Sequence, residues 1–286
     1  MDFIVTLLLP LAIAIIMLSL GTGLTLNDFR RIGQRPRVFL IGALCQVVLL
    51  PALAYGVIVM FGFANQTAVG IMILAACPGG VTSNIVTKLV GWDVALSVTL
   101  TAASSLTCVI TAPLILDVAM RGFVAADTPS VEISRTALVV FMLSTVPVMA
   151  GVAFRALAPH TASRIEPGLA RIAVLLFCAV IVAAILSNLN VIADDLLRLG
   201  PALLFLIVTL SAVSFLVSRR FGATAIQART ITIEAGLQNG SLGIGIAALV
   251  VGAGDGFSPY AVPSAVYSVI YLLTVLPLLF LVRALR

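Results

Sequence analysis

Glu234 is the residue best suited to carry chemistry in this sequence, because its carboxylate lies in a stretch of mostly apolar and small residues, TITIEAGLQNGSLGIGIAALVVG. A carboxylate at the centre of a membrane helix costs about 2.5–3.5 kcal/mol on insertion scales, so it predicts a functional site. Two chemistries are open at this point. The carboxylate can bind a cation, or it can carry a proton.

Helix-breaking residues follow this carboxylate and recur in a second apolar stretch. Residues 236–241 (GLQNGS) interrupt the first stretch, and residues 78–80 (PGG) interrupt the second, with Ser83 and Asn84 close behind. Glycine and proline disfavour a continuous helix, so each stretch is predicted to form two half-helices, with Ser83 and Asn84 capping the later half of the second stretch. Pro78 alone would indicate only a kink. Two interrupted segments together are typical of a transporter's binding site at the membrane midplane.

Hydroxyl and amide side chains occur in the neighbouring segments. Ser97, Thr101 and Ser105 are spaced by four residues and share one helix face. Taken singly, each hydroxyl is more typical of a bond to its own helix carbonyl. Gln46, in the apolar run GALCQVVLLPALAY, also needs a partner if it is buried. With Glu234 these groups offer only oxygen ligands, which favours a hard cation, and a lone carboxylate favours Na⁺ over Ca²⁺.

The composition is that of a polytopic membrane protein. Of the 286 residues, 62% are hydrophobic and 9% are charged, and the mean hydropathy is +1.24, so we expect an all-α chain with no sizeable domain outside the bilayer. Its four cysteines all lie in apolar segments and predict no disulfide framework. The N-terminus runs directly into an apolar stretch without a basic region, which predicts a retained span.

Nine transmembrane helices are predicted within a single domain, residues 1–286. Their approximate ranges are 3–22, 37–62, 66–90, 93–119, 134–157, 167–189, 199–219, 224–252 and 258–283. If the first loop is cytoplasmic, only Arg121, Arg135 and Arg198 of the sixteen Lys and Arg residues fall on the outer side. This asymmetry predicts a cell (inner) membrane protein with its N-terminus outside and its C-terminus in the cytoplasm. It explains the net charge of +5 without a nucleic-acid partner.

In this orientation the two interrupted spans, the third and the eighth, run in opposite directions. That is the arrangement of an inverted repeat, in which spans one to four pair with spans six to nine and the two broken helices cross. The fifth span is left without a partner. We therefore expect the midplane site at the crossing of the two broken helices.

At these residues the chain resembles a known family, the bile acid:sodium symporters. The match rests on AACPGGVTSNIVTKLVGWDVALSVTLTAASSLT and TITIEAGLQNGSLG, and nearly the whole chain fits nine-span members. The resemblance implies two transported Na⁺ ions. The first would be held by Ser83, Asn84, Ser97, Thr101 and Glu234. The second would be held by Gln46, Glu234 and Gln238 with the main-chain oxygens of Ala235 and Leu237.

The resemblance also implies a moving architecture and a substrate side. A core (about 37–119 and 199–286) would move against a panel (about 1–36 and 120–198), and Asn239 would face the substrate. The chain departs from the family pattern at Val81, Gly240 and Tyr271, which border the expected cavity. We place the substrate near Val81, Thr82, Asn239, Gly240 and Tyr271.

The sequence thus predicts a Na⁺-coupled symporter of a small organic anion, which is not an enzyme and has no evident obligate protein partner. Bile acids, other steroid conjugates, pantoate-like acids and keto acids remain open as substrates. The alternatives are a proton-coupled carrier, an arsenite or other metalloid exporter that uses Cys77, and a membrane receptor or scaffold without transport. His160, in an arginine-rich loop, is expected to be solvated.

Overall fold

A computed structural model of the chain describes residues 7–25, 27, 28, 30, 33, 36–124, 132–251 and 258–284. Within these residues every regular element is helical. The elements are α1 (Leu9–Thr22), α3 (Pro36–Leu44), the π-helix η2 (Cys45–Leu49), α4 (Leu50–Phe61), α5 (Asn65–Ala76), α6 (Val81–Leu89), α7 (Val94–Phe123), α8 (Ile133–Val140), the π-helix η3 (Phe141–Thr145), α9 (Val146–Leu157), α10 (Pro159–Ser187), α11 (Leu189–Arg220), α12 (Ala225–Gly236), α13 (Gly240–Val250), the 3-10 helix η4 (Pro259–Ala261) and α14 (Val262–Ala284).

Five helical segments of the described residues are long and apolar enough to cross a bilayer. They are Pro36–Phe61, Val94–Phe123, Ile133–Leu157, Pro159–Ser187 and Leu197–Arg220. Shorter apolar helices cover Leu9–Thr22, Asn65–Ala76 and Gly240–Val250. The all-helical prediction is confirmed. The count of nine spans and the inverted repeat stay predictions, because half-helices of 9 to 12 residues (α5, α6, α12 and α13) do not cross a bilayer singly.

Two helices begin earlier than the hydropathy pattern predicts. α10 begins at Pro159, eight residues before the predicted span, and α11 begins at Leu189, ten residues before it. Proline favours the first turn of a helix because its missing N–H has no partner there in any case. His160 therefore lies on the exposed first turn of α10 rather than in a loop. Hydropathy marks the part of a helix in lipid, whereas the helix itself extends into the polar region.

Two of the long segments contain a π-helix that ends two residues before a proline. η2 ends one residue before Leu50-Pro51, and η3 ends one residue before Val146-Pro147. A proline inside a helix cannot donate its backbone hydrogen bond and its ring collides with the preceding turn. Widening that turn to the π form accommodates the ring, and such segments frequently lie at functional sites. Gln46 lies within η2.

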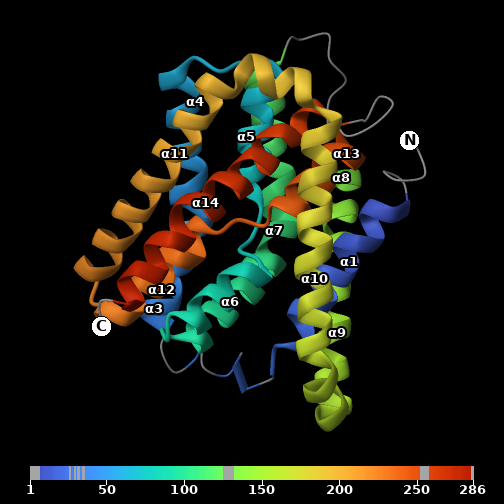
Figure 1. The fold of residues 1–286 in the computed structure, drawn as a ribbon, viewed down its shortest axis with the longest axis vertical. Coiled ribbons are helices and arrows are strands. Elements are labelled where there is room, and N and C mark those ends of the chain that lie inside the picture. Colours follow the sequence, from blue (N-terminus) through green and yellow to red (C-terminus); the bar gives the residue numbers. More distant parts are fainter. Residues whose placement is uncertain are drawn as a thin grey trace.

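The helices form two neighbouring groups (Figure 1). α1 packs against α9 and α10, while α11 packs against α4, α12 and α14. The α1–α9 contact is close because Gly21 and Gly151 lie in it, and a Cβ on either residue would collide with the backbone of the other helix. α5 contacts α7, and α6 contacts α7 and α12, so the two interrupted segments lie beside α7.

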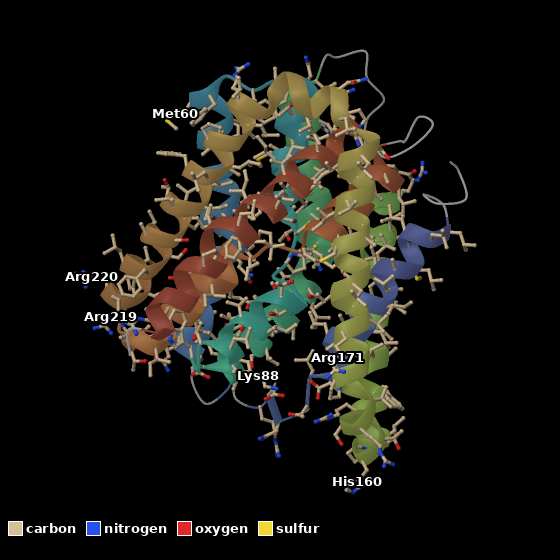
Figure 2. The ribbon with its side chains drawn as sticks, in the orientation of Figure 1. Met60, Lys88, His160, Arg171, Arg219 and Arg220 are labelled. Carbon is tan, nitrogen blue, oxygen red and sulfur yellow. The ribbon has the colours of Figure 1, made fainter. Side chains whose placement is uncertain are left out.

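Several basic side chains lie toward one end of the molecule. Figure 2 shows Lys88, Arg219 and Arg220 in the lower half of the view, whereas Met60 of α4 lies at the top. This grouping follows the loop assignment made from the sequence. Arg31, Arg35, Asp127, Asp255 and Arg286, which also entered that assignment, lie outside the described residues. The orientation of the termini stays a prediction.

Candidate functional site

The two interrupted helices meet through their unwound segments. α5 ends at Ala76 and α6 begins at Val81, while α12 ends at Gly236 and α13 begins at Gly240. Between these ends, Gly79 and Gln238 form an isolated antiparallel bridge, and the Asn239 N–H donates to the Pro78 carbonyl at 2.9 Å. Each unwound segment thus satisfies part of the other's backbone, which is required of irregular chain buried at membrane depth.

Glu234 lies beside this bridge and is 1% exposed. Its carboxylate occupies the space that a Cβ on Gly79 would fill. Only glycine therefore permits α12 and the 78–80 segment to approach as closely as they do.

Hydroxyl groups of α7 surround the carboxylate. Ser97 Oγ donates to Glu234 Oε2 at 2.7 Å, and Thr101 Oγ1 donates to Glu234 Oε1. The Asn84 Oδ1 atom of α6 lies 2.8 Å from Ser97 Oγ and 3.4 Å from Thr101 Oγ1. Ser83 approaches the same carboxylate. Five side chains predicted as one cation site therefore converge within the described structure, although their role as ligands stays a prediction.

The capping role predicted for Ser83 and Asn84 is wrong. Gly80 is the N-cap of α6, and no side chain caps this end. Ser83 donates instead to the Gly80 carbonyl at 2.7 Å. α6 begins at Val81 because Gly80, its N-cap, adopts an extended conformation. Ser83 and Asn84 therefore lie inside the first turns of the helix, and the Asn84 Oδ1 atom lies near the Ser97 and Thr101 hydroxyls.

The second predicted group gathers at the C-terminal end of α12. Gln46 Nε2 donates to the Glu234 carbonyl at 3.1 Å, and Gln238 Nε2 donates to the Ala235 carbonyl at 2.5 Å. Leu237 is buried in the same turn. The Oε1 atoms of Gln46 and Gln238 are buried and have no hydrogen-bond partner. Rotating both amides would turn these oxygens toward the same carbonyls, which suits a cation placed between them.

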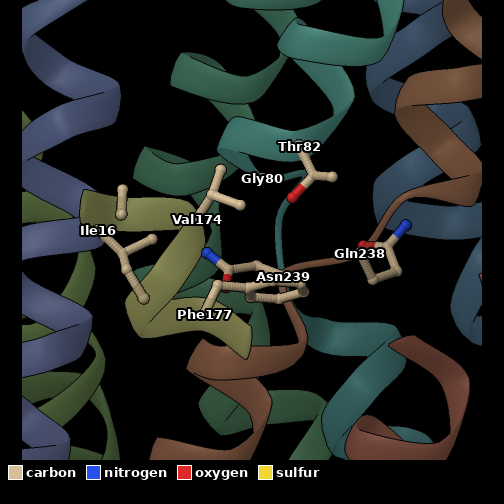
Figure 3. Close-up of a pocket in the computed structure, with 8 residues that line it drawn as sticks. Ile16, Gly80, Thr82, Val174, Phe177, Gln238 and Asn239 are labelled. Carbon is tan, nitrogen blue, oxygen red and sulfur yellow. The ribbon is translucent and has the colours of Figure 1, made fainter. Parts of the chain in front are cut away.

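A small cavity lies where the crossing faces α1 and α10. It is about 10 Å³, the space of one water, and is lined by Ile16, Gly80, Thr82, Ala173, Val174, Phe177, Gln238 and Asn239. Figure 3 shows Thr82 and Asn239 on the side of the crossing that faces Val174 and Phe177. The Asn239 Oδ1 atom accepts from Leu242 N at 3.1 Å and Ser241 Oγ at 2.8 Å, whereas its Nδ2 atom has only the weak acceptor Met17 Sδ at 3.5 Å.

The other predicted substrate residues lie differently. The Gly240 Cα faces Ser268 of α14, and Tyr271 packs against Gly236 and Tyr267 inside the helix group. Neither lines the small cavity. The side chain of Val81 lies outside the described part of the structure.

The sequence analysis did not identify Ile16, Val174 and Phe177, which form the apolar wall of the cavity. Their side chains resemble any lipid-facing residue of α1 or α10, so no sequence signal marked them. Cys77 is buried and donates to the Ile73 carbonyl at 3.2 Å. No group of three or more His, Cys, Asp and Glu residues suited to a metal occurs among the described residues.

The sequence of this chain matches a known protein family and several of its members. The model of the Sodium Bile acid symporter family matches residues 10–195. The uncharacterized sodium-dependent transporter YocS of Bacillus subtilis is 28% identical over 263 residues, covering 90% of this chain and 77% of that protein. The probable sodium/metabolite cotransporter BASS1 (chloroplastic) of Arabidopsis thaliana is 30% identical over 258 residues, covering 90% and 63%. The ileal sodium/bile acid cotransporter of Oryctolagus cuniculus is 30% identical over 246 residues, covering 85% and 69%.

The helical architecture and these similarities define a multi-pass membrane protein of a transporter class. The chain belongs to the sodium bile acid symporter family. The family resemblance inferred from the motifs at residues 75–107 and 230–243 is thereby confirmed.

Proposed function

We propose that this protein is a secondary active symporter that couples the movement of Na⁺ to that of a small organic anion by alternating access. The observation that carries the proposal is the buried carboxylate of Glu234, which accepts hydrogen bonds from Ser97 and Thr101 at the crossing of two broken helices. A buried carboxylate needs a compensating positive charge. Because the described structure offers hydroxyl and amide oxygens around it and no basic side chain, a bound cation meets that need.

Sodium suits this site better than a proton does. The hydroxyls of Ser97 and Thr101 lie within hydrogen-bond reach of both Glu234 carboxylate oxygens, an arrangement that an ionised carboxylate, which accepts at both oxygens, accommodates. Each hydroxyl keeps lone pairs that can face a cation, and Asn84 adds an amide oxygen. Two of the relatives, a sodium-dependent transporter and a sodium/bile acid cotransporter by name, agree with this choice.

A second Na⁺ is proposed at the end of α12. The supporting observation is the pair of buried, unpartnered oxygens on Gln46 and Gln238, next to the carbonyls of Glu234 and Ala235. A buried polar atom without a partner calls for a bound water or ion. The ligands proposed are those implied by the family resemblance: Gln46, Glu234 and Gln238, with the main-chain oxygens of Ala235 and Leu237.

The substrate is proposed to be an anion held beside the crossing. α6 and α13 both begin there, and helix N-termini carry free N–H groups and partial positive charge. The Asn239 amide nitrogen, left with a weak acceptor, provides a donor for a carboxylate. Ile16, Val174 and Phe177 face these polar groups across the cavity, so the anion is expected to have one apolar side. Val81, Thr82, Gly240 and Tyr271 are kept as neighbouring candidates.

Transport is proposed to occur as the core (about 37–119 and 199–286) moves against the panel (about 1–36 and 120–198). The separate packing of α1 with α9 and α10 supports this division. The cavity at the crossing lies between residues of both parts, so relative movement would expose it to one side or the other. The N-terminus is proposed to lie outside and the C-terminus in the cytoplasm of a cell with this protein in its inner membrane.

The test is a thermal unfolding series of the purified protein in Na⁺, K⁺, Li⁺ and choline buffers at constant ionic strength, followed by a screen of organic anions in Na⁺. A ligand at 100 times its dissociation constant stabilises the native state by about 2.7 kcal/mol. Na⁺ is expected to raise the melting temperature selectively, and Glu234→Gln is expected to remove the effect. Glu166→Gln, a surface carboxylate 3.8 Å from Arg155, is the matched control. Equal stabilisation by all cations contradicts the proposal.

A further inference from the structure

A column of buried hydroxyl groups leads from Glu234 toward the end of the molecule that carries Lys88. Ser97 Oγ, which donates to Glu234, also accepts from Thr87 Oγ1 of α6 at 3.4 Å. Beyond it, Thr230 Oγ1 of α12 accepts from the Asp93 N–H at 3.1 Å. Ser97, Thr87 and Thr230 are fully buried. Several hydroxyl groups buried together in an apolar interior are uncommon unless they help helices pack or line a polar route.

Helical spacing aligns these residues on two facing helices. Asp93, at the N-cap of α7, precedes Ser97 by four residues, and Thr230 precedes Glu234 by four on α12. Residues four apart lie on the same face, one turn above the other. The Asp93–Thr230 pair therefore lies one turn from the Ser97–Glu234 pair, with Thr87 of α6 beside them.

One turn of α7 separates the candidate cation site from the partly exposed connection between α6 and α7. Four residues of α7 rise about 6 Å. Asp93 is half-buried, whereas Ser97 is fully buried, so the step from one to the other crosses from an accessible to an enclosed position. The Asp93 carboxylate accepts from Leu96 N at 3.1 Å and supplies negative charge at the accessible end. The neighbouring residue Trp92 has the Arg229 guanidinium over its ring, 5.8 Å from the ring centroid.

We propose that Thr87, Asp93 and Thr230 form a passage through which the cation at Glu234 leaves toward the end of the molecule that carries Lys88, with Asp93 as its last stop. The passage takes a monovalent hard cation such as Na⁺, whose hydration shell the three side-chain oxygens replace in turn. It runs inside the seam between α6, α7 and α12, not through the cavity that faces α10. The inference rests on the proposed Na⁺ coupling.

A role in helix packing alone predicts different mutant behaviour from a role in ion release. Thr230 Oγ1 donates to the Ile226 carbonyl at 3.0 Å, as a threonine in a membrane helix ordinarily does, and Thr232 makes the same bond to Ala228 at 2.9 Å. Thr87 differs, because its hydroxyl donates across helices to Ser97. If packing were the whole explanation, replacing these hydroxyls by methyl groups would change stability without changing how fast a cation leaves.

The experiment measures the rate at which bound radioactive Na⁺ is displaced by excess unlabelled Na⁺ from the purified protein. Thr87→Val and Thr230→Val are expected to release Na⁺ about two- to tenfold more slowly, the effect of losing one hydrogen bond at a barrier. Thr232→Val, on the same helix as Thr230, is the matched control and is expected to release it at the wild-type rate. All variants are expected to keep Na⁺-dependent thermal stabilisation, since none removes a proposed ligand.

The proposed passage is overturned if Na⁺ leaves Thr87→Val and Thr230→Val as fast as it leaves Thr232→Val. The ion would then leave by another route, such as past Asn84. Loss of Na⁺ stabilisation in Thr87→Val also overturns it, because the hydroxyl would then be part of the equilibrium site. If the wild-type protein itself shows no Na⁺ stabilisation, the proposed function fails instead.

Asp93 is tested separately through Trp92, the single tryptophan of the chain. Asp93→Asn keeps a good helix cap and removes the charge. The fluorescence of Trp92 is expected to shift on Na⁺ addition in the wild type and to stay unchanged in Asp93→Asn. No shift in the wild type, or an equal shift in the variant, counts against Asp93 as a stop.

Discussion

The Glu234 carboxylate lies directly against the Cα of Gly79, in the space that a Cβ would occupy. This contact joins the two interrupted helices at the position where their backbones form a bridge. The absence of a side chain on one broken helix thus sets where the carboxylate of the other can sit. Gly79 is therefore as much a part of the candidate cation site as the residues that present oxygens to it.

Replacing Gly79 by alanine is expected to displace Glu234 and to abolish the Na⁺-dependent rise in melting temperature. Overpacking of this kind costs about 1–3 kcal/mol, so the variant should also be less stable without Na⁺. Gly80→Ala is the matched control, because a Cβ there meets nothing closer than 3.8 Å. Thermal unfolding of both variants with and without Na⁺ checks this, and a full Na⁺ response in Gly79→Ala would contradict it.

Ser97 and Thr101 are expected to act as one unit. Each donates to the Glu234 carboxylate, so Ser97→Ala and Thr101→Val should each weaken apparent Na⁺ affinity by up to about tenfold. The double variant should lose less than the product of the two, because the residues serve the same ion. Na⁺ titrations of unfolding temperature give the three affinities. Thr107→Val removes an exposed hydroxyl that donates to its own helix at 2.8 Å and serves as control; strictly multiplicative losses would indicate separate packing roles.

Gln46 and Gln238 are expected to govern a second cation. Leucine at either position removes a buried amide oxygen that has no protein partner, so the Na⁺ dependence of transport should lose its cooperativity while Na⁺ still binds. The measurement is initial uptake rate against Na⁺ concentration in proteoliposomes. Gln66→Leu, an exposed glutamine at the start of α5, is the control. Unchanged cooperativity in both buried variants would remove the basis for a second ion.

Asn239→Asp is expected to weaken anion binding without affecting Na⁺ binding. The aspartate keeps the helix cap that Asn239 provides to Leu242 N, but it replaces the amide donor by a negative charge. Anion uptake should therefore fall strongly, while Na⁺ stabilisation without anion persists. Asn239→Ala is the comparison and should also lose about 0.5–2 kcal/mol of stability with the cap. Uptake by Asn239→Asp at the wild-type rate would show that the anion binds elsewhere.

Much of the candidate site was predictable because its residues carry two strong signals. Glu234 is costly in an apolar segment, and the glycine and proline interruptions mark where each helix breaks. Ser97 and Thr101 are four residues apart, which predicted that they share one helix face, and both contact Glu234 in the structure. These signals depend on residue type and spacing, which the sequence displays directly.

The remainder depends on contacts between distant segments. Phe177 lines the cavity beside the crossing, yet it looks like a lipid-facing residue, since one apolar side chain serves lipid and cavity equally well. The identity of the α6 N-cap, Gly80 in place of Ser83 or Asn84, was missed because it follows from the backbone conformation of Gly80, which glycine permits but does not dictate. The early starts of α10 and α11 were missed because hydropathy reports immersion in lipid and not helix length.

The π-helix that carries Gln46 has a consequence for the direction in which that side chain points. A π turn holds about one residue more than an α turn, and one residue corresponds to about 100° of rotation around the axis. The side chains of α3 are therefore rotated about the helix axis relative to those of α4, although both helices belong to one segment, Pro36–Phe61. Any change that returns residues 45–49 to a regular α-helix must rotate α3 about its axis relative to α4. Gln46 would turn with it, away from the Glu234 carbonyl to which its amide now donates.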